Sequence, residues 1–210
     1  IKVLTGDLSE AQCPAKLVDD ALKAFGGLDA VVSNAGITSP APLIDLPVSK
    51  WDKLLNVNAR ATLLLAQAAY PALKESKGAL VAVASMSGMG AHPGMGAYSP
   101  SKAALISLCQ VLAQEWACDG INVNTVSPGM IRTPLTQKVY ENNQIAKERA
   151  ALVPWGRVGN PEDISNVISF LLSPEANYIT GQNILVDGGF VDSLYRHIPG
   201  LPDSSEIDKT

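Results

Sequence analysis

The sequence predicts an α/β protein in which a doubly wound parallel sheet is flanked by helices. Two observations lead to this fold class. First, short apolar runs alternate with longer segments of helical periodicity, and strands that are apolar along their whole length are typical of a parallel sheet buried on both faces. Second, polar or glycine-rich residues follow the first strands, where ligands of such sheets bind. The carboxyl ends of the strands are therefore the place to look for a site.

Strands and helices are expected in alternation along the chain. Apolar and β-branched runs predict strands at Ile1–Thr5 (the end of a strand), Asp29–Ser33, Ala79–Ala84, Ile121–Val126 and Asn183–Val186. Helical periodicity predicts helices at Ser9–Phe25, Ser49–Lys74, Tyr98–Cys118 and Pro161–Leu172. This alternation is what a parallel sheet with crossover helices requires.

The first and last helices carry recognisable end signals. Ser9 is a candidate N-cap of the first helix, and Gly26 with Gly27 forms its stop signal. Asn160 is a candidate N-cap of the last helix, because Pro161 then occupies the first helical position, where a missing N–H costs nothing.

Each of the first four predicted strands ends in polar or glycine-rich residues. These ends are Gly6-Asp7, Asn34-Ala35-Gly36, Ser85 and Pro128-Gly129. Asn, Gly and Pro also punctuate ordinary loops, so simple turns are the alternative interpretation. Because the carboxyl ends of parallel strands meet at one edge of the sheet, the sequence predicts that the four ends share one crevice.

Composition and charge exclude several classes of protein. Hydrophobic residues make up 47% of the 210 residues, which indicates a globular rather than a disordered chain. The formal net charge is −4 and there is no basic cluster, so neither nucleic acid nor a membrane surface is expected as a partner. No apolar run has the length of a membrane span and no signal peptide opens the chain, so a cytoplasmic location is expected.

No metal site is expected. Cys13, Cys109 and Cys118 are isolated and form no C-x-x-C pair, so free thiols in a reducing compartment are predicted. The two histidines, His92 and His197, are far apart in the sequence. The motifs H-E-x-x-H and G-x-S-x-G are absent.

The most informative residues are Ser85, Tyr98 and Lys102. Tyr98 and Lys102 are four apart, so on a helix they point from the same face, one turn apart. A phenol has an ordinary pKa of about 10, and a neighbouring ammonium is expected to lower that pKa. A hydroxyl from Ser85 would then hold a substrate oxygen against the phenol. This constellation predicts acid–base chemistry on a carbonyl or an alcohol.

Each of these residues has an alternative reading. A tyrosine four residues before a lysine occurs by chance in many helices. Ser87 competes with Ser85 for the serine role and is otherwise a candidate substrate contact. His92 lies in the glycine-rich loop beside the site, where it is a candidate substrate contact or a solvent-facing loop residue.

One expected motif is missing. A dinucleotide-binding sheet normally opens with a strand, a G-x-G-x-x-G turn and a helix, and no such turn occurs in this sequence. The chain also starts within a predicted strand and without Met. The sequence is therefore interpreted as N-terminally truncated by about one and a half βα units, or about 45 residues. The expected organisation is a single dinucleotide-binding and catalytic domain over 1–190 and a C-terminal tail over 191–210.

Several motifs occur in a specific order and spacing. They are Asp7-Leu8, Leu28 to Gly36, Asn56-Val57-Asn58, Ser85 with Tyr98 and Lys102, Pro128 to Thr133, Pro154 to Asp163, and Thr180 to Gly189. In this combination the chain resembles the single-domain branch of the short-chain dehydrogenase/reductase family. It departs from the family pattern at Ser33, which replaces an Asn, and in the missing glycine-rich turn. The resemblance implies a Rossmann-type fold and an oxidoreductase that transfers hydride between NAD or NADP and its substrate.

The resemblance also assigns roles to individual residues. It implies that Tyr98 transfers the proton, Lys102 acts on Tyr98 and the nicotinamide ribose, Ser85 orients the substrate oxygen, and Asn58 holds a water that relays protons. The implied cofactor-binding residues are Asp7, Leu8, Asn34, Ala35, Gly36, Tyr98, Lys102, Pro128, Gly129, Ile131 and Thr133. The residue that decides between NAD and NADP belongs to the missing segment, so both cofactors stay open.

The expected substrate is a small or medium alcohol or ketone. The segment 134–153 lies where the family keeps a mobile lid, and its charged residues and Tyr140 predict an amphipathic helix that closes over the site, a surface helix being the alternative. Tyr140 is therefore a candidate substrate residue. Asp119 stands where the family's carrier-protein reductases have Arg, which argues against an acyl-carrier-protein substrate.

Two other functions are kept open: an epimerase or dehydratase on the same scaffold, and a catalytically silent interaction protein. A homo-oligomer, a tetramer or a dimer, is also expected. The helices Ser49–Lys74 and Tyr98–Cys118 resemble the pair that forms a four-helix interface in this family. On the second helix, Leu112 is expected to face outward.

Overall fold

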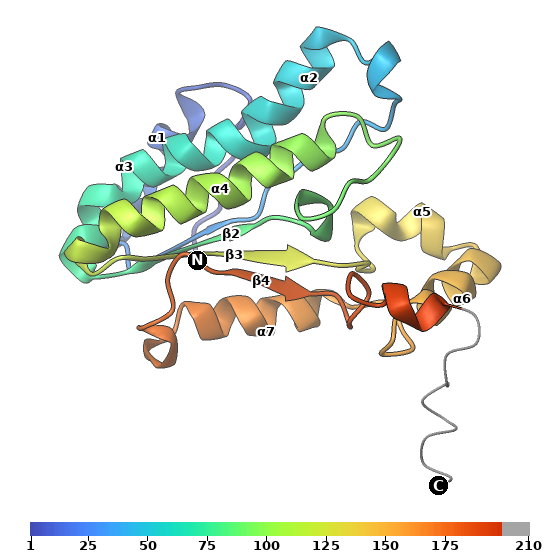
Figure 1. Ribbon diagram of the computed structural model, residues 1–210. Coiled ribbons are helices and arrows are strands. Elements are labelled where there is room, and N and C mark those ends of the chain that lie inside the picture. The colour runs from blue at the N-terminus through green and yellow to red at the C-terminus, as the bar shows by residue number, and fades with distance from the viewer. Residues whose placement is uncertain (199–210) are drawn as a thin grey trace, which may run out of the picture.

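The protein is organised around a four-stranded parallel sheet, seen in a computed structural model that describes residues 1–198, without the side chain of His197 (Figure 1). The strands lie in the order β1-β2-β3-β4, and every neighbouring pair is parallel. Their bounds are β1 Ala30–Ser33, β2 Ala79–Val83, β3 Asn122–Pro128 and β4 Asn183–Val186. The four predicted strands from Asp29 onward are confirmed, with ends that differ by one or two residues.

Helices cover both faces of this sheet. Their bounds are α1 Cys13–Phe25, α2 Val48–Leu55, α3 Ala61–Ser76, α4 Tyr98–Trp116, α5 Gln137–Tyr140, α6 Asn143–Leu152 and α7 Pro161–Leu171. Figure 1 shows α1, α3 and α4 on one face and α7 on the other. Parallel neighbours need such crossover connections, so the doubly wound α/β fold is confirmed.

The core has one part on each face of the sheet. Successive strand residues point to opposite faces, so Leu80 and Ala82 join the cluster that packs under α3 and α4. Val81 and Val126 instead join Ile164 of α7 in the second cluster. Burial of each large apolar side chain contributes about 1.5–3 kcal/mol, and burial on both faces explains why β2 is apolar throughout.

The first helix starts later than the sequence predicts. Ser9 is not its N-cap: the backbone N–H and hydroxyl of Ser9 both donate to Asp7 Oδ1, at 2.8 and 2.7 Å. This local turn competes with the helix, which begins at Cys13. The predicted stop is confirmed, since Gly26 adopts φ +78° and donates its N–H to Leu22 O.

The expectation of a strand end at Ile1–Thr5 is wrong within the described residues. This segment has no regular secondary structure and pairs with none of the four strands. A strand needs a hydrogen-bonded neighbour, and β1 has only β2 beside it. Gly6-Asp7 is therefore not a strand end, whereas the other three ends follow β1, β2 and β3 at one edge of the sheet.

The predicted long helix Ser49–Lys74 is interrupted. Helix α2 passes into a π-helical turn at Asn56–Arg60 and continues as α3. A π turn inserts one extra residue into the helical spacing and is found most often at functional sites. It lies at the residue triplet 56–58, which the family resemblance had singled out.

The lid segment forms two short helices rather than one. Helix α6 has its own N-cap, Asn142, whose side chain accepts from the N–H groups of Gln144 and Ile145. The cap predicted for α7 is confirmed, because Asn160 and Asp163 form a reciprocal capping box. A 3-10 turn at Leu194–His197 follows the last strand. The rest of the predicted tail, 199–210, lies outside the described residues.

Candidate active site

Ser85 lies at the carboxyl end of β2, in the middle of the sheet. The preceding residue is still held in the sheet, since the N–H of Ala84 donates to Val126 O at 2.7 Å. Ser85 then caps a 3-10 turn, and its hydroxyl accepts the N–H of Ser87 at 3.1 Å. Both serines are buried. The turn thus fixes the Ser85 hydroxyl at the sheet edge.

Tyr98 and Lys102 lie in the first turns of α4. Burial raises the pKa of the Tyr98 phenol, and a hydrogen-bonding interaction with the Ser85 hydroxyl lowers it by less. The Lys102 ammonium lies 5.9 Å from the centre of the Tyr98 ring. The structure therefore brings the three predicted residues into one cluster, with the phenol protonated at neutral pH.

The expected lowering of the Tyr98 pKa by Lys102 is wrong for this structure. Lys102 is only 3% exposed, and burial lowers its own pKa to about 8. The lysine therefore loses its charge before the free phenol titrates, and an ammonium can act on Tyr98 only below about pH 8. Below about pH 8 the ammonium is present, held by a 2.7 Å hydrogen bond to Val83 O.

Asn58 lies in the π turn, and its side chain forms hydrogen bonds both to the segment that follows β1 and to α4. Its side-chain Oδ1 accepts from the N–H of Ile37 at 2.8 Å, and its Nδ2 donates to Ile37 O at 3.0 Å and to the hydroxyl of Ser101 at 2.9 Å. Both amide protons are therefore used within the protein. One lone pair of Oδ1 is left for a further partner.

Sequence reasoning missed Ser101. This serine is fully buried, and its hydroxyl donates to Tyr98 O at 2.7 Å while accepting from Asn58. It thereby links two of the predicted site residues. A serine three residues after Tyr98 and next to Lys102 was the available signal, but serine in a first helical turn is too common to be singled out.

Gly36 explains why a glycine follows β1. A Cβ built on this residue would lie 3.2 Å from Lys102 Nζ and 3.5 Å from Asn58 Oδ1. The backbone at Gly36 therefore packs directly against two of the predicted site residues. Asn34, Ala35 and Gly36 are themselves exposed, which leaves them accessible to a ligand.

Ser87 and His92 form a second polar pair beside the cluster. The Ser87 hydroxyl lies 3.0 Å from His92 Nδ1. His92 is exposed, so its ring is fixed on one side and free to meet a ligand on the other. These two of the three predicted substrate residues thus lie within the segment that joins Ser85 to Tyr98.

The close packing of Gly88 on α4 supplies a stability prediction. A Cβ at Gly88 would lie 2.8 Å from the Lys102 carbonyl carbon and 2.9 Å from Ile106 Cδ1. We expect Gly88→Ala to lower the free energy of unfolding by about 1–3 kcal/mol, measured by urea unfolding, because the turn must move off the helix. Gly90→Ala is the matched control, since a Cβ there has no neighbour within 4 Å. Equal losses in the two variants would contradict the packing argument.

The segment after β3 follows the expected course. The N–H of Gly129 donates to Val186 O at 2.9 Å, and a Cβ on Gly129 would lie 2.5 Å from Asp187 Cβ. The predicted residues Pro128, Ile131 and Thr133 continue along the sheet edge, and Thr133 forms a capping box with Thr136. This edge is shared with Ser85, because β2 and β3 are neighbours.

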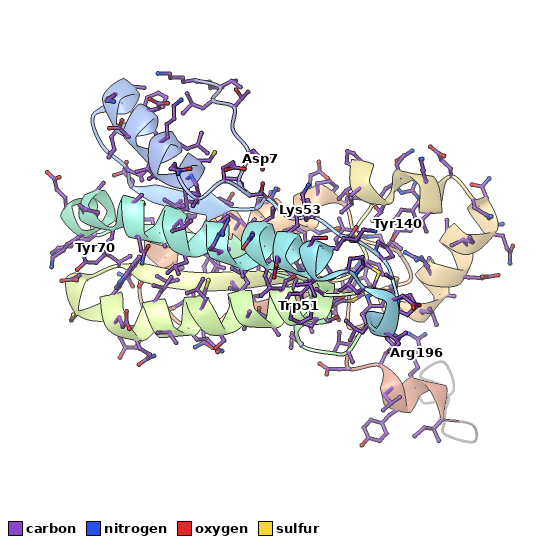
Figure 2. All side chains as sticks on the ribbon, turned by 90° about the horizontal axis from the view of Figure 1, so that it is seen from above. Asp7, Trp51, Lys53, Tyr70, Tyr140 and Arg196 are labelled. Atoms are coloured by element: carbon purple, nitrogen blue, oxygen red, sulfur yellow. The ribbon has the colours of Figure 1, made fainter. Side chains whose placement is uncertain are left out.

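Asp7 and Leu8 lie apart from the cluster. Figure 2 shows Asp7 in the segment before α1, and hydrogen bonds from Ser9 lower the pKa of its exposed carboxyl. Arg60, at the end of the π turn, donates a hydrogen bond to Ser9 O. This bond connects the segment around Asp7 to the π turn that contains Asn58.

Tyr140, the third predicted substrate residue, lies in the lid and is 4% exposed. Figure 2 shows it at the end of the molecule where the lid helices lie.

A separate cavity of about 170 Å³ lies on the α7 side of the sheet edge. Its lining includes Met130, Trp155, Arg157 and Asp187, and none of the three cluster residues. Ligand pockets usually measure about 300–1,000 Å³, so this cavity is too small to be the main site.

Residues 1–198 contain no group of three or more His, Cys, Asp or Glu side chains placed to hold a metal ion. In the same part of the chain, no helix combines the length and the apolar character that a membrane crossing requires.

Comparison with known proteins agrees with this geometry. Residues 1–191 match the family model described as enoyl-(acyl carrier protein) reductase. The chain is 39% identical over 178 residues to the 3-oxoacyl-[acyl-carrier-protein] reductase of Thermotoga maritima, covering 84% of this chain and 71% of the relative. It is 37% identical over 190 residues to dehydrogenase/reductase SDR family member 4 of Bos taurus, covering 89% and 68%.

Solved structures show the same fold with nicotinamide cofactors. A Pseudomonas aeruginosa RhlG complex with NADP superposes with a TM-score of 0.84 at 32% identity, covering 89% of this chain and 75% of that one. A 4-hydroxyisoleucine dehydrogenase complexed with NADH also has a TM-score of 0.84, at 34% identity, covering 91% and 79%. The sequence matches, the sheet and the strand-end residues lead to one conclusion: the chain belongs to the short-chain dehydrogenase/reductase family of oxidoreductases.

Proposed function

We propose that the protein transfers hydride between NAD or NADP and a small or medium alcohol or carbonyl substrate. The observation that carries this proposal is the cluster of Ser85, Tyr98 and Lys102 at the carboxyl edge of the sheet, with a buried ammonium near a partly buried phenol. Burial of a charged lysine costs folding free energy, so the stability of the fold does not explain why a lysine lies here.

The strand ends fit a nicotinamide cofactor. Exposed backbone at Asn34 to Gly36 lies directly against Lys102, and a side chain at Gly36 would fill that space. Pro128 to Thr133 would hold the nicotinamide end from β3, while Asp7 and Leu8 would contact the adenine end. When bound, the cofactor supplies or accepts the hydride.

The protein's own residues handle the proton. In carbonyl reduction, Tyr98 donates its phenolic proton to the substrate oxygen, which suits a phenol whose pKa is raised by burial. Ser85 orients that oxygen with its fixed hydroxyl. The phenolate left on Tyr98 forms near the Lys102 ammonium, which stabilises it below about pH 8. In alcohol oxidation the proton moves in the opposite direction.

The substrate proposal takes account of Asp119. Its carboxylate forms an ion pair with Lys74 at 2.7 Å and accepts a hydrogen bond from the Tyr70 hydroxyl at 2.5 Å. This corner of the molecule therefore presents a neutralised pair rather than a free cation. This ion pair supports a free small molecule as the substrate, rather than a substrate that is attached to an acidic carrier protein.

A spectrophotometric assay tests the proposed function. The purified protein is given NADH or NADPH with a panel of ketones, and loss of the reduced cofactor is followed. We expect turnover with at least one ketone and a preference for one cofactor. The absence of ketone-dependent turnover with either cofactor would count against the proposal.

We also propose that the protein forms a homo-oligomer through α3 and α4. The outward residue named from the sequence, Leu112, is wrong, because it is 5% exposed and lies in the core. A large apolar residue that α4 does present to solvent is Val111, at 51% exposed. Helical spacing predicted a wide apolar arc, but the sheet and α3 cover more of it than expected.

We expect Val111→Asp to dissociate the assembly, because a carboxylate in an apolar interface loses its hydration without gaining a partner. Light scattering on size-exclusion fractions measures the mass. Val48→Asp is the control, since Val48 is an equally apolar, 74% exposed residue on α2. A wild-type monomer, or an assembly unchanged in Val111→Asp, would contradict this proposal.

A further inference from the structure

Tyr140 is a buried phenol with no structural explanation in the lid. It is 4% exposed, and its hydroxyl has no hydrogen-bond partner among the described residues. Most buried hydroxyl groups in proteins are hydrogen-bonded, so an unpaired one calls for a ligand or another cause. The reaction proposed above uses Tyr98 and leaves Tyr140 without a role.

Two guanidinium groups accompany this phenol. The central carbon of Arg132 lies 5.3 Å from the centre of the Tyr140 ring, and that of Arg149 lies 5.6 Å from the same point. Arg132 comes from the loop after β3 and Arg149 from α6, so two separate segments bring their charges together. Attraction to the aromatic ring helps to hold both cations against Tyr140.

Within residues 1–198, no carboxylate pairs with either of these two charges. Glu148, the acidic neighbour of Arg149 in the sequence, instead accepts a hydrogen bond from Gln144 at 2.8 Å. An anion beside these guanidinium groups would be attracted by their positive charge and would accept hydrogen bonds from their N–H groups.

Arg132 of this cluster lies next to a predicted cofactor-binding residue at the carboxyl edge of the sheet. Arg132 directly follows Ile131, and its backbone N–H donates to Gly159 O at 2.9 Å, which fixes the loop at the edge of β3. Ser85 leaves the neighbouring strand at the same edge. An anion held by Arg132 would therefore lie beside the segment that is predicted to hold the nicotinamide end of the cofactor.

We infer that Arg132, Arg149 and the Tyr140 hydroxyl form an anion-binding subsite that selects substrates carrying a carboxylate or a phosphate ester besides the reacting carbonyl or alcohol. The inference names the substrate class of the proposed oxidoreductase and rests on that function. Guanidinium groups suit both anions, because their paired N–H groups match two anionic oxygens.

Binding of simple anions to the purified protein tests the subsite directly. The probes are acetoacetate, inorganic phosphate and, as the neutral analogue of acetoacetate, acetone; isothermal titration calorimetry measures the affinities. The double variant Arg132→Met/Arg149→Met should lose on the order of 10-fold or more in affinity for the bound anion. The control is Lys138→Met/Lys147→Met, which removes the same charge from exposed residues of the same segment.

A second variant guards against a folding defect. Tyr140→Phe keeps the aromatic ring on which the arginines pack and removes only the unpaired hydroxyl. It should weaken anion binding by about 3-fold and leave thermal unfolding at or above the wild-type temperature. A subsite that does not use the hydroxyl would show unchanged affinity in this variant.

The outcomes separate the possibilities. Acetoacetate binding indicates a carboxylate substrate, and phosphate binding indicates a phosphate ester. Binding of neither anion, or equal losses in the arginine and lysine double variants, would overturn the subsite. Tyr98→Phe should bind the anion like the wild type. If the wild type binds the anion but turns over no substrate, only the proposed reaction is contradicted. If it turns over neutral ketones but binds no anion, only the subsite is contradicted.

Discussion

Tyr98→Phe is expected to reduce turnover by at least about 10²-fold, because the variant has no proton to give to or take from the substrate oxygen. Its affinity for the cofactor should change little, since the aromatic ring is kept. The removed hydroxyl interacts with Ser85 and is raised in pKa by burial, so it is the group best placed to transfer that proton.

Steady-state kinetics and cofactor titration measure these two effects separately. Tyr178→Phe is the matched control, because Tyr178 is fully exposed and lies far from the cluster in the sequence. Turnover within a few-fold of the wild type in Tyr98→Phe would remove Tyr98 from the proposed mechanism. A large loss in Tyr178→Phe would show that the assay reports general damage.

Lys102→Met is expected to lower turnover by about 10²-fold without lowering stability at neutral pH. Turnover falls because the phenolate formed on Tyr98 loses the ammonium that stabilises it, and removal of one such group typically costs about that factor. Stability is retained because burial of a charged ammonium destabilises the wild-type fold. Lys102 is only 3% exposed, and this burial lowers its pKa to about 8. Methionine is a close match for the lysine stem.

The lowered Lys102 pKa also predicts how stability changes with pH. Between about 8 and the ordinary value of 10.5, the unfolded lysine is protonated and the folded one is not. The unfolded state then binds more protons, so the Lys102 contribution rises with pH across this window and is lost as pH falls through about 8.

Urea unfolding at several pH values, compared between wild type and Lys102→Met, measures that contribution. The free energy of unfolding of the wild type should rise relative to that of the variant by up to about 1.4 kcal/mol per pH unit within the window. The comparison is necessary because burial raises the pKa of Cys109 to about 12, which acts in the opposite direction in both proteins. Lys16→Met, which removes an exposed lysine of α1, is the matched control variant. Parallel curves for wild type and Lys102→Met would contradict the burial argument.

The sequence predicted the features that depend on local spacing. The four apolar strands from Asp29 onward, the Gly26 stop and the Asn160 cap depend on a few neighbouring residues, and the structure confirms them. The Tyr98 and Lys102 pair followed from helical geometry alone. The placement of Ser85 beside them required the parallel order of the strands, which the alternating pattern supplied.

The features that were missed depend on tertiary packing. Leu112 could not be assigned to the core from helical periodicity, because its burial depends on how α4 rests on the sheet. The π turn around Asn58 has no compositional marker, and the direction of the Tyr98 pKa shift depends on how far the phenol itself is buried. The pairing of Arg132 with Arg149 around Tyr140 joins two segments that no sequence pattern connects.

Transfer of deuterium from a nicotinamide cofactor labelled at C4 to a ketone is the direct test of hydride transfer by this protein. The purified protein is incubated with the labelled, reduced cofactor and a ketone that it turns over, and the alcohol is analysed by mass spectrometry. We expect one deuterium on the carbinol carbon with the wild type, and about 10²-fold less labelled product in the same time with Tyr98→Phe. Alcohol without deuterium, or equal labelling by the two proteins, would contradict this expectation.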